Sequence, residues 1–149
     1  MPSIIPGYVY TFFALTVIAA LLIATFSVYA VSVKQDAEIE QLNNLLEYVA
    51  AESCEIISTS TTNNSTVTVR VPMPYRVGEK SYWVQFRNDS SSAWIEGGFG
   101  TTPVQSHFTV FVPGPVAASG LYISGYGFAE LKCQVQGTLT VLNLSEVSG

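Results

Sequence analysis

Apolar residues follow three successive patterns along the chain. Between Met1 and Val33 there is no Asp, Glu, Lys, Arg or His, and Tyr8–Val33 is a run of 26 residues without Gly or Pro. As an α-helix this run would be about 39 Å long, enough to cross a hydrocarbon layer about 30 Å thick. We therefore expect residues 8–33 to form a membrane anchor.

Two other interpretations of the apolar run fit the sequence less well. A buried core helix would need a large soluble protein around it, and too few residues follow to provide one. A secretory signal peptide has a shorter apolar core preceded by Lys or Arg, whereas no basic residue precedes this one. The pattern favours an anchor that is retained.

The second pattern, over residues 34–57, is that of an amphipathic helix, because apolar positions recur every three or four residues. The expected face consists of Ile39, Leu42, Leu46, Val49, Ser53 and Ile56, widened by Leu45, Ala50 and Ile57. No Gly or Pro separates the two patterns, so we expect one continuous helix of roughly 50 residues. The face packs against the chain's own globular part, against a helix of another subunit, or against both.

The third pattern is that of short strands separated by turns. Ser58–Ser65 is expected to be a polar linker, and Gly97-Gly98 is one of several expected turns. Seven strands are predicted, at Thr66–Val71, Tyr82–Arg87, Ala93–Glu96, Gln105–Val112, Leu121–Ser124, Phe128–Gln134 and Thr138–Leu142. The predicted fold class is α+β: a long N-terminal helix (1–57) followed by an antiparallel, immunoglobulin-like β-sandwich head (58–149).

Charge and candidate chemistry narrow the function classes. The 149 residues include 6 basic and 11 acidic ones, which leaves no clustered basic patch for nucleic acid. His107 is the only histidine, so catalytic triads and histidine metal sites lack partners. We expect no enzyme activity, no cofactor, no metal and no nucleic-acid partner.

The cysteines and the glycosylation sequons indicate an extracellular head. Cys54 and Cys133 form no metal-binding or redox motif, so we predict a disulfide between them, with two unpaired buried thiols as the alternative. Such a bridge would close a loop of 79 positions and contribute about 4–5 kcal/mol in the chain-entropy estimate. Four Asn-x-Ser/Thr sequons follow the anchor, at Asn63, Asn64, Asn88 and Asn143.

Several aromatic residues offer a sugar-binding face as a further hypothesis. The candidates are Tyr75, Tyr82, Trp83 and Trp94. In an alternating strand, however, Trp83 and Gln85 point to one side and Tyr82 to the other, so packing within the sheet is the favoured interpretation. A lectin-like function remains a third hypothesis, which free glycans would test by shifting the tryptophan fluorescence.

The succession of an uncharged apolar helix, an amphipathic helix and a β head resembles the archaeal type IV pilins and pilin-like proteins. The segment Val69–Val84 (VRVPMPYRVGEKSYWV) is similar to a strand, Pro, Gly and Tyr-led strand pattern of that group. The resemblance implies a prepilin cleavage site after Gly7. The chain departs from the family in having no Lys or Arg before Gly7, and it has Phe12 where bacterial pilins have Glu.

The resemblance also implies a function as a filament subunit. The apolar helix would rest in the membrane and then bundle with other copies in a filament, with the heads exposed to surface glycans or other cells. Ala20 and Ala24 form a small-xxx-small pair that permits close helix approach. The alternative is an anchored accessory protein that does not polymerise, such as a minor pilin or an envelope tether resembling archaeal flagellar stator proteins.

Overall fold

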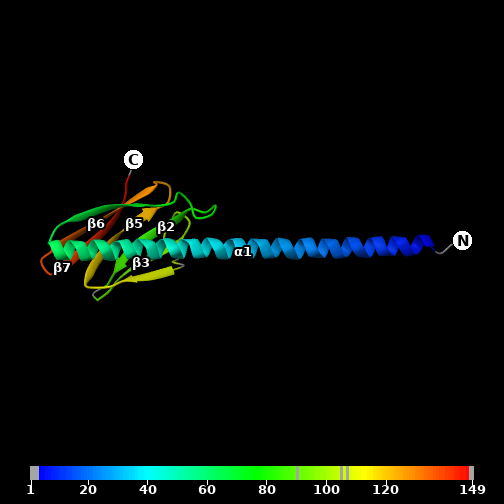
Figure 1. Ribbon diagram of the computed structural model, residues 1–149, viewed down its shortest axis with the longest axis horizontal. Helices are drawn as coiled ribbons and strands as arrows, with labels where there is room; N and C mark the ends of the chain where they lie inside the picture. The colour runs from blue at the N-terminus through cyan, green and yellow to red at the C-terminus, as the bar shows by residue number, and fades with distance from the viewer. Residues whose placement is uncertain (1–3, 90, 105, 107, 148–149) are drawn as a thin grey trace. The chain divides into compact units, whose positions relative to one another are not determined.

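One long helix and seven strands make up the chain in a computed structural model that describes residues 4–89, 91–104, 106 and 108–147 (Figure 1). The chain divides into two compact units, one up to Ala37 and one from Glu38 onward. Helix α1 (Ile4–Asn63) supplies all the secondary structure of the first unit and continues into the second. The expected α+β fold, with a long N-terminal helix and a β head, is confirmed.

The helix begins before the predicted anchor at residues 8–33 and extends beyond the predicted end at residue 57. At its start Pro6 lies in the first turn, where the missing N–H of proline would have had no intrahelical partner. At its end the expected polar linker is wrong up to Asn63. The hydroxyls of Thr59 and Thr62 donate to the carbonyls of Glu55 and Ser58, at 2.9 and 2.8 Å. Both hydroxyls therefore have hydrogen-bond partners within the helix.

A Schellman-type cap ends the helix. Asn64 has a positive φ of 47°, which asparagine tolerates better than most residues. The next amide, that of Ser65, donates to the carbonyl of Ser60 at 3.3 Å, and the Ser60 hydroxyl returns a 2.6 Å bond to the Ser65 carbonyl. Ser60 itself is fully buried, so its position in the head fixes where the helix ends.

All seven predicted strands are present, with shifted ends. Their bounds are β1 (Val67–Pro72), β2 (Tyr82–Asn88), β3 (Ala93–Phe99), β4 (Phe108–Val112), β5 (Val116–Ile123), β6 (Phe128–Gln136) and β7 (Leu139–Glu146). They form one sheet in the order β1-β6-β7-β5-β2-β3-β4. Every neighbouring pair is antiparallel except β5 and β7, which are parallel.

The second layer of the head is the helix. Where the sequence predicted two facing sheets, the strands form one hydrogen-bonded sheet, because β5 pairs with both β2 and β7 and so joins the two halves. The second half of α1 packs across one face of this sheet (Figure 1). The apolar face of the helix therefore supplies the cover that a second sheet would have given.

The core lies between the helix and the sheet. Leu42 and Leu46 are completely buried and Val49 is 1 % exposed, and they join one apolar cluster with inward-facing residues of the strands. The amphipathic pattern differs at its start, where Ile39 is 38 % exposed and Glu38 is only 4 % exposed. The first buried side chain along the described part of the helix is therefore that of Glu38.

Gly97 lies in the middle of β3, so the predicted turn at Gly97-Gly98 is wrong. A Cβ at position 97 would lie 2.8 Å from both methyl groups of Leu46, closer than atoms in contact can approach. The glycine therefore leaves room for a helix side chain to press against the sheet. In sequence it is indistinguishable from a turn glycine.

Candidate functional site

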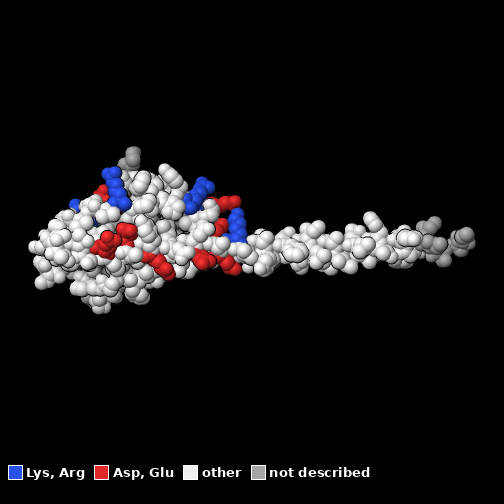
Figure 2. Space-filling view, in the orientation of Figure 1, with Lys and Arg blue, Asp and Glu red and all other residues white. Residues whose placement is uncertain are grey.

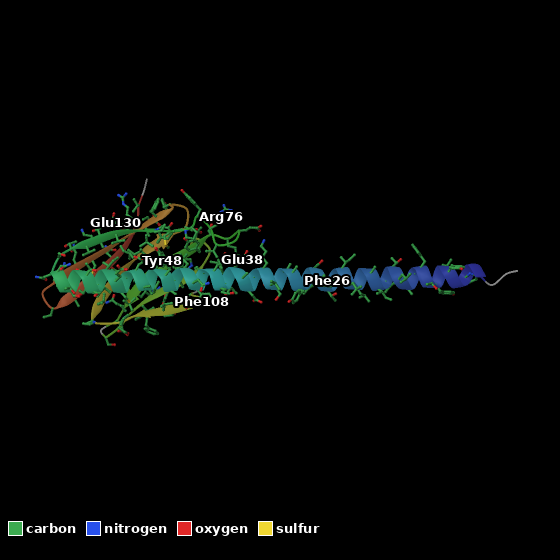
Figure 3. All side chains as sticks on the ribbon, in the orientation of Figure 1. Phe26, Glu38, Tyr48, Arg76, Phe108 and Glu130 are labelled. Atoms are coloured by element: carbon green, nitrogen blue, oxygen red, sulfur yellow. The ribbon has the colours of Figure 1, made fainter. Side chains whose placement is uncertain are left out.

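The first unit presents an apolar helix surface on all sides. Phe12 is 74 % exposed and Phe26 is 68 % exposed, and the large apolar side chains around them are similarly open. Figure 3 labels Phe26, whose side chain stands out from the helix, and Figure 2 shows no charged side chain along this stretch. The helix is long and apolar enough to cross a membrane.

Four hydroxyl groups in this apolar stretch donate hydrogen bonds to the helix itself. Thr11, Thr16 and Ser27 donate to the carbonyls four residues earlier, and Thr25 donates to the one three residues earlier, at 2.8–3.0 Å. In hydrocarbon, a polar group without a hydrogen-bond partner costs roughly several kcal/mol of free energy. The local bonds remove that cost, so the segment suits a lipid or protein environment without water.

Ala20 and Ala24 lie within this stretch, one helical turn apart, and both are exposed. Two small side chains on one face leave a shallow place where another helix backbone could approach. Their role in packing between copies stays a prediction. The same holds for cleavage after Gly7, which lies in the first turns of the helix.

At the start of the second unit, an ion pair between a buried carboxylate and a half-exposed ammonium joins a loop of the head to the helix. The Glu38 carboxylate lies 2.7 Å from the Lys80 ammonium, with side chains 6 % and 47 % exposed. The same ammonium lies 5.0 Å from the ring centroid of Phe99, in cation–π geometry. Gly78, with a φ of 62°, lies against Glu38, and a Cβ there would overlap its side chain.

Sequence reasoning missed the inward position of Glu38 because charge alone placed this residue on the polar side. A usable signal was present in the spacing: residues 38, 42, 46, 49 and 53 follow one another at intervals of 4, 4, 3 and 4. That is the period of the buried face. The partner, Lys80, lies in a turn far along the chain, and no local pattern identifies it.

The structure does not support the predicted disulfide, because both cysteines are free. Cys133 is fully buried on β6, and its thiol interacts with the Ser60 hydroxyl. Cys54 lies six residues before Ser60, roughly 9 Å along the helix axis at 1.5 Å per residue. The helix therefore presents a serine to Cys133. Both thiols are free, as in the alternative, but only Cys133 is buried and Cys54 is half-buried.

The four sequon asparagines are all exposed. Asn63 and Asn64 lie at the end of α1, Asn88 ends β2, and Asn143 lies in β7. Exposure satisfies the steric requirement for a glycan, and their modification stays a prediction.

The aromatic candidates separate into packing residues and surface residues. Tyr82 and Trp83 are 0 % and 1 % exposed, as expected for packing, and the Tyr82 hydroxyl donates to the Pro74 carbonyl at 2.7 Å. Burial raises the pKa of Tyr82 well above its usual range. Tyr75 is exposed. Trp94 is half-buried and shares a face of the sheet with Trp83, so both tryptophans lie on the side opposite to Tyr82 and to the helix.

That other face, directed away from the helix and called the outer face here, carries a polar and aromatic cluster. The Trp94 indole N–H donates to Glu96 Oε1 at 2.7 Å, and Glu96 Oε2 lies 3.1 Å from Arg87 Nε. Arg87 also donates to Gln85 Oε1 at 3.4 Å. Phe111 of β4 lies beside Trp94, with ring centroids 6.4 Å apart.

The register of the sheet brings this cluster together. Arg87 is opposite Trp94 in the β2–β3 pair, and Trp94 is opposite Phe111 in the β3–β4 pair. Sequence reasoning singled out Trp94 but missed the residues around it. The available signal was the alternation in the two predicted strands that pair with the strand of Trp94. It identifies the neighbours of Trp94 only when the order of the strands is known.

No metal-binding group is found among the residues that the structure describes. They include no group of three or more His, Cys, Asp and Glu placed to hold a metal ion. His107 lies outside the described residues. The absence of enzyme activity stays a prediction.

Comparison with protein families, with curated proteins and with solved structures finds no match to this chain.

Proposed function

We propose that this protein is the structural subunit of a surface filament resembling an archaeal type IV pilus. The apolar first part of α1 bundles with the same segment of other copies, and the β head faces outward. The observation that carries the proposal is the exposure of an uncharged helix surface, on which Phe12, Phe13 and Phe26 are each at least 67 % exposed. Such a surface needs a cover other than water.

The physical basis of assembly is the exchange of one apolar environment for another. Before assembly, lipid chains surround the segment, where the hydroxyls of Thr16 and Ser27 keep hydrogen bonds to the helix itself. In the filament, neighbouring helices replace the lipid, so the transfer free energy is small and side-chain packing decides the outcome. The small side chains of Ala20 and Ala24 favour that packing because helix backbones can approach closely at them.

The second part of α1 belongs to the head. Leu42, Leu46 and Val49 are buried against the sheet, and Glu38 is paired with Lys80. The apolar stretch and this packed part belong to the same helix, so each copy would contribute one helix to the bundle and one head to the surface.

The test is to shear cells that display the protein and to separate long filaments from membranes. The wild-type protein is expected in the filaments. Ala20→Phe combined with Ala24→Phe should leave membrane insertion intact and abolish filaments, whereas the matched control, Ala20→Ser with Ala24→Ser, keeps small side chains and should assemble. Filaments formed by the double Phe variant would refute the packing argument.

A wild-type protein that stays with the membranes after shearing would instead support the second candidate, an anchored accessory protein that does not polymerise. The local hydrogen bonds of the apolar stretch favour lipid as well as helix neighbours, so this candidate rests on the same segment. The orientation with the head outside the cell belongs to both candidates.

A further inference from the structure

We propose that the outer face of the sheet carries a carbohydrate-binding site built on Trp94 and Phe111, and that its ligand is a neutral oligosaccharide of another surface. The site lies on strands β2, β3 and β4 and on β5 beside them. It uses no residue of the apolar helix, so it stands or falls separately from filament assembly.

The aromatic pair provides a stacking surface. Phe111 is 67 % exposed although it is a large apolar side chain, and the Trp94 ring beside it is inclined by 54°. The carbon-bound hydrogens of a pyranose ring form a weakly positive, apolar face that packs on the negative face of an aromatic ring. Two inclined rings can hold one sugar from below and from the side.

Polar groups around the rings are held in fixed positions. Glu96 accepts from the Trp94 indole through one carboxylate oxygen and pairs with Arg87 through the other, at 2.7 and 3.1 Å. Side chains that are already ordered lose little conformational entropy when a ligand binds. They supply donors and acceptors at the edge of the rings, where the hydroxyl groups of a stacked sugar lie.

The charge of the cluster selects against ionic ligands. One guanidinium and one carboxylate, those of Arg87 and Glu96, compensate each other at 3.1 Å. An anion attracted by Arg87 would be repelled by Glu96, and a cation attracted by Glu96 would be repelled by Arg87. A neutral ligand rich in hydroxyl groups is the class that uses both.

A hollow next to Trp94 gives the ligand space. It has a volume of about 540 Å³ and is lined by Gln85, Phe86, Arg87, Asn88, Trp94, Ala118, Ser119 and Gly120. It is a shallow depression open to solvent, so a ligand held there would keep one side exposed. Polar side chains of Gln85, Arg87 and Ser119 line it beside the tryptophan, which fits successive sugar units better than an apolar peptide.

Asn88, a sequon residue, lines the same hollow and offers a second source of sugar. A glycan attached there would occupy the site from the chain's own surface. The proposal commits to a sugar from another surface, because the exposed Phe111 lies on β4, at the edge of the sheet, where an outside ligand has access.

The experiment uses the full chain, made in a host without N-glycosylation and held in phosphatidylcholine nanodiscs. Maltoside detergents are avoided because their head groups belong to the ligand class under test. Binding to an array of neutral and acidic oligosaccharides is measured first. The best neutral ligand is then titrated against wild type, Trp94→Ala, Phe111→Ala and the matched control Phe128→Ala.

Phe128 is a suitable control because it is 52 % exposed and lies on β6, five strands away from β4. Phe111→Ala and Trp94→Ala are each expected to weaken binding by about tenfold or more, which corresponds to the loss of one aromatic stacking contact, and Phe128→Ala to leave it unchanged. Glu96→Gln should weaken binding while the melting temperature stays within a few degrees of wild type.

The proposal is overturned if no neutral oligosaccharide binds to the unglycosylated protein, or if Phe111→Ala binds as tightly as Phe128→Ala. Binding of acidic oligosaccharides alone would also contradict it, because the compensated charges would then not decide the ligand. Glycosylation at Asn88 gives a further test. If the glycosylated protein does not bind and Asn88→Gln restores binding, the result supports the site and shows that the chain's own glycan competes for it.

Discussion

Leu46→Ala and Gly97→Ala perturb the same contact between helix and sheet from its two sides. Leu46 is completely buried, so its truncation removes apolar contacts and leaves a void, at a cost of about 3 kcal/mol within the usual range of 2–5. Gly97→Ala places a methyl group 2.8 Å from both Leu46 methyls and should cost about 1–3 kcal/mol. The backbone alone would favour Ala at this position by about 0.4–1 kcal/mol, so destabilisation would identify the contact as the cause.

The double variant decides whether the contact is the one described. With Leu46 shortened, the new methyl group at position 97 fills part of the void, so the second substitution should cost little or even stabilise. The coupling free energy should be about 1–3 kcal/mol. Urea denaturation of the full chain in nanodiscs, followed by near-ultraviolet circular dichroism, measures all the terms.

A control cycle pairs Gly97→Ala with Leu142→Ala. Leu142 is also completely buried but lies on β7, three strands from β3, roughly 14 Å away at 4.8 Å per strand. Those two changes should add within about 0.5 kcal/mol. Additivity of Leu46→Ala and Gly97→Ala within the same margin would refute the packing of the helix against this glycine.

Two further predictions concern groups buried in the head. Lys80→Met should destabilise the head by about 1–3 kcal/mol, because the Glu38 carboxylate, 6 % exposed, loses its ion pair with Lys80. The exposed Arg76→Met should change the unfolding free energy by less than about 0.5 kcal/mol, and equal effects would contradict the ion pair. Burial raises the pKa of Cys133 above 9.0, so the stability from its neutral thiol is complete below pH 9 and is lost as pH rises further. Cys133→Ala should therefore show a smaller fall in melting temperature between pH 8 and pH 10 than wild type, and an identical fall would count against thiol burial as the cause.

The elements of the fold were predictable because their signals are local. The charge-free run ending at Val33 and the three-to-four spacing of Leu42, Leu46 and Val49 identified one helix, and alternation identified all seven strands. Local signals do not specify how strands pair. The parallel β5–β7 contact, which makes one sheet of the strands, connects segments that have no sequence relation to each other.

The errors occurred where tertiary contacts override local preference. Gly97 and the Ser58–Asn63 segment have turn-like compositions, yet one leaves room for Leu46 and the other is held helical by the buried Ser60. The cluster around Trp94 was missed for a related reason. Its residues come from three strands and meet only through the register, so a single strand shows one tryptophan and no site.

The claim on which the account rests is that the apolar first part of α1 ends up covered by the same segment of other copies. Electron cryomicroscopy of material sheared from cells tests it directly. We predict filaments whose central density is a bundle of helices, with Phe26 and its neighbours in contact between copies and the sheet at the periphery. Filaments with heads at the centre and the apolar helices directed outward would contradict it.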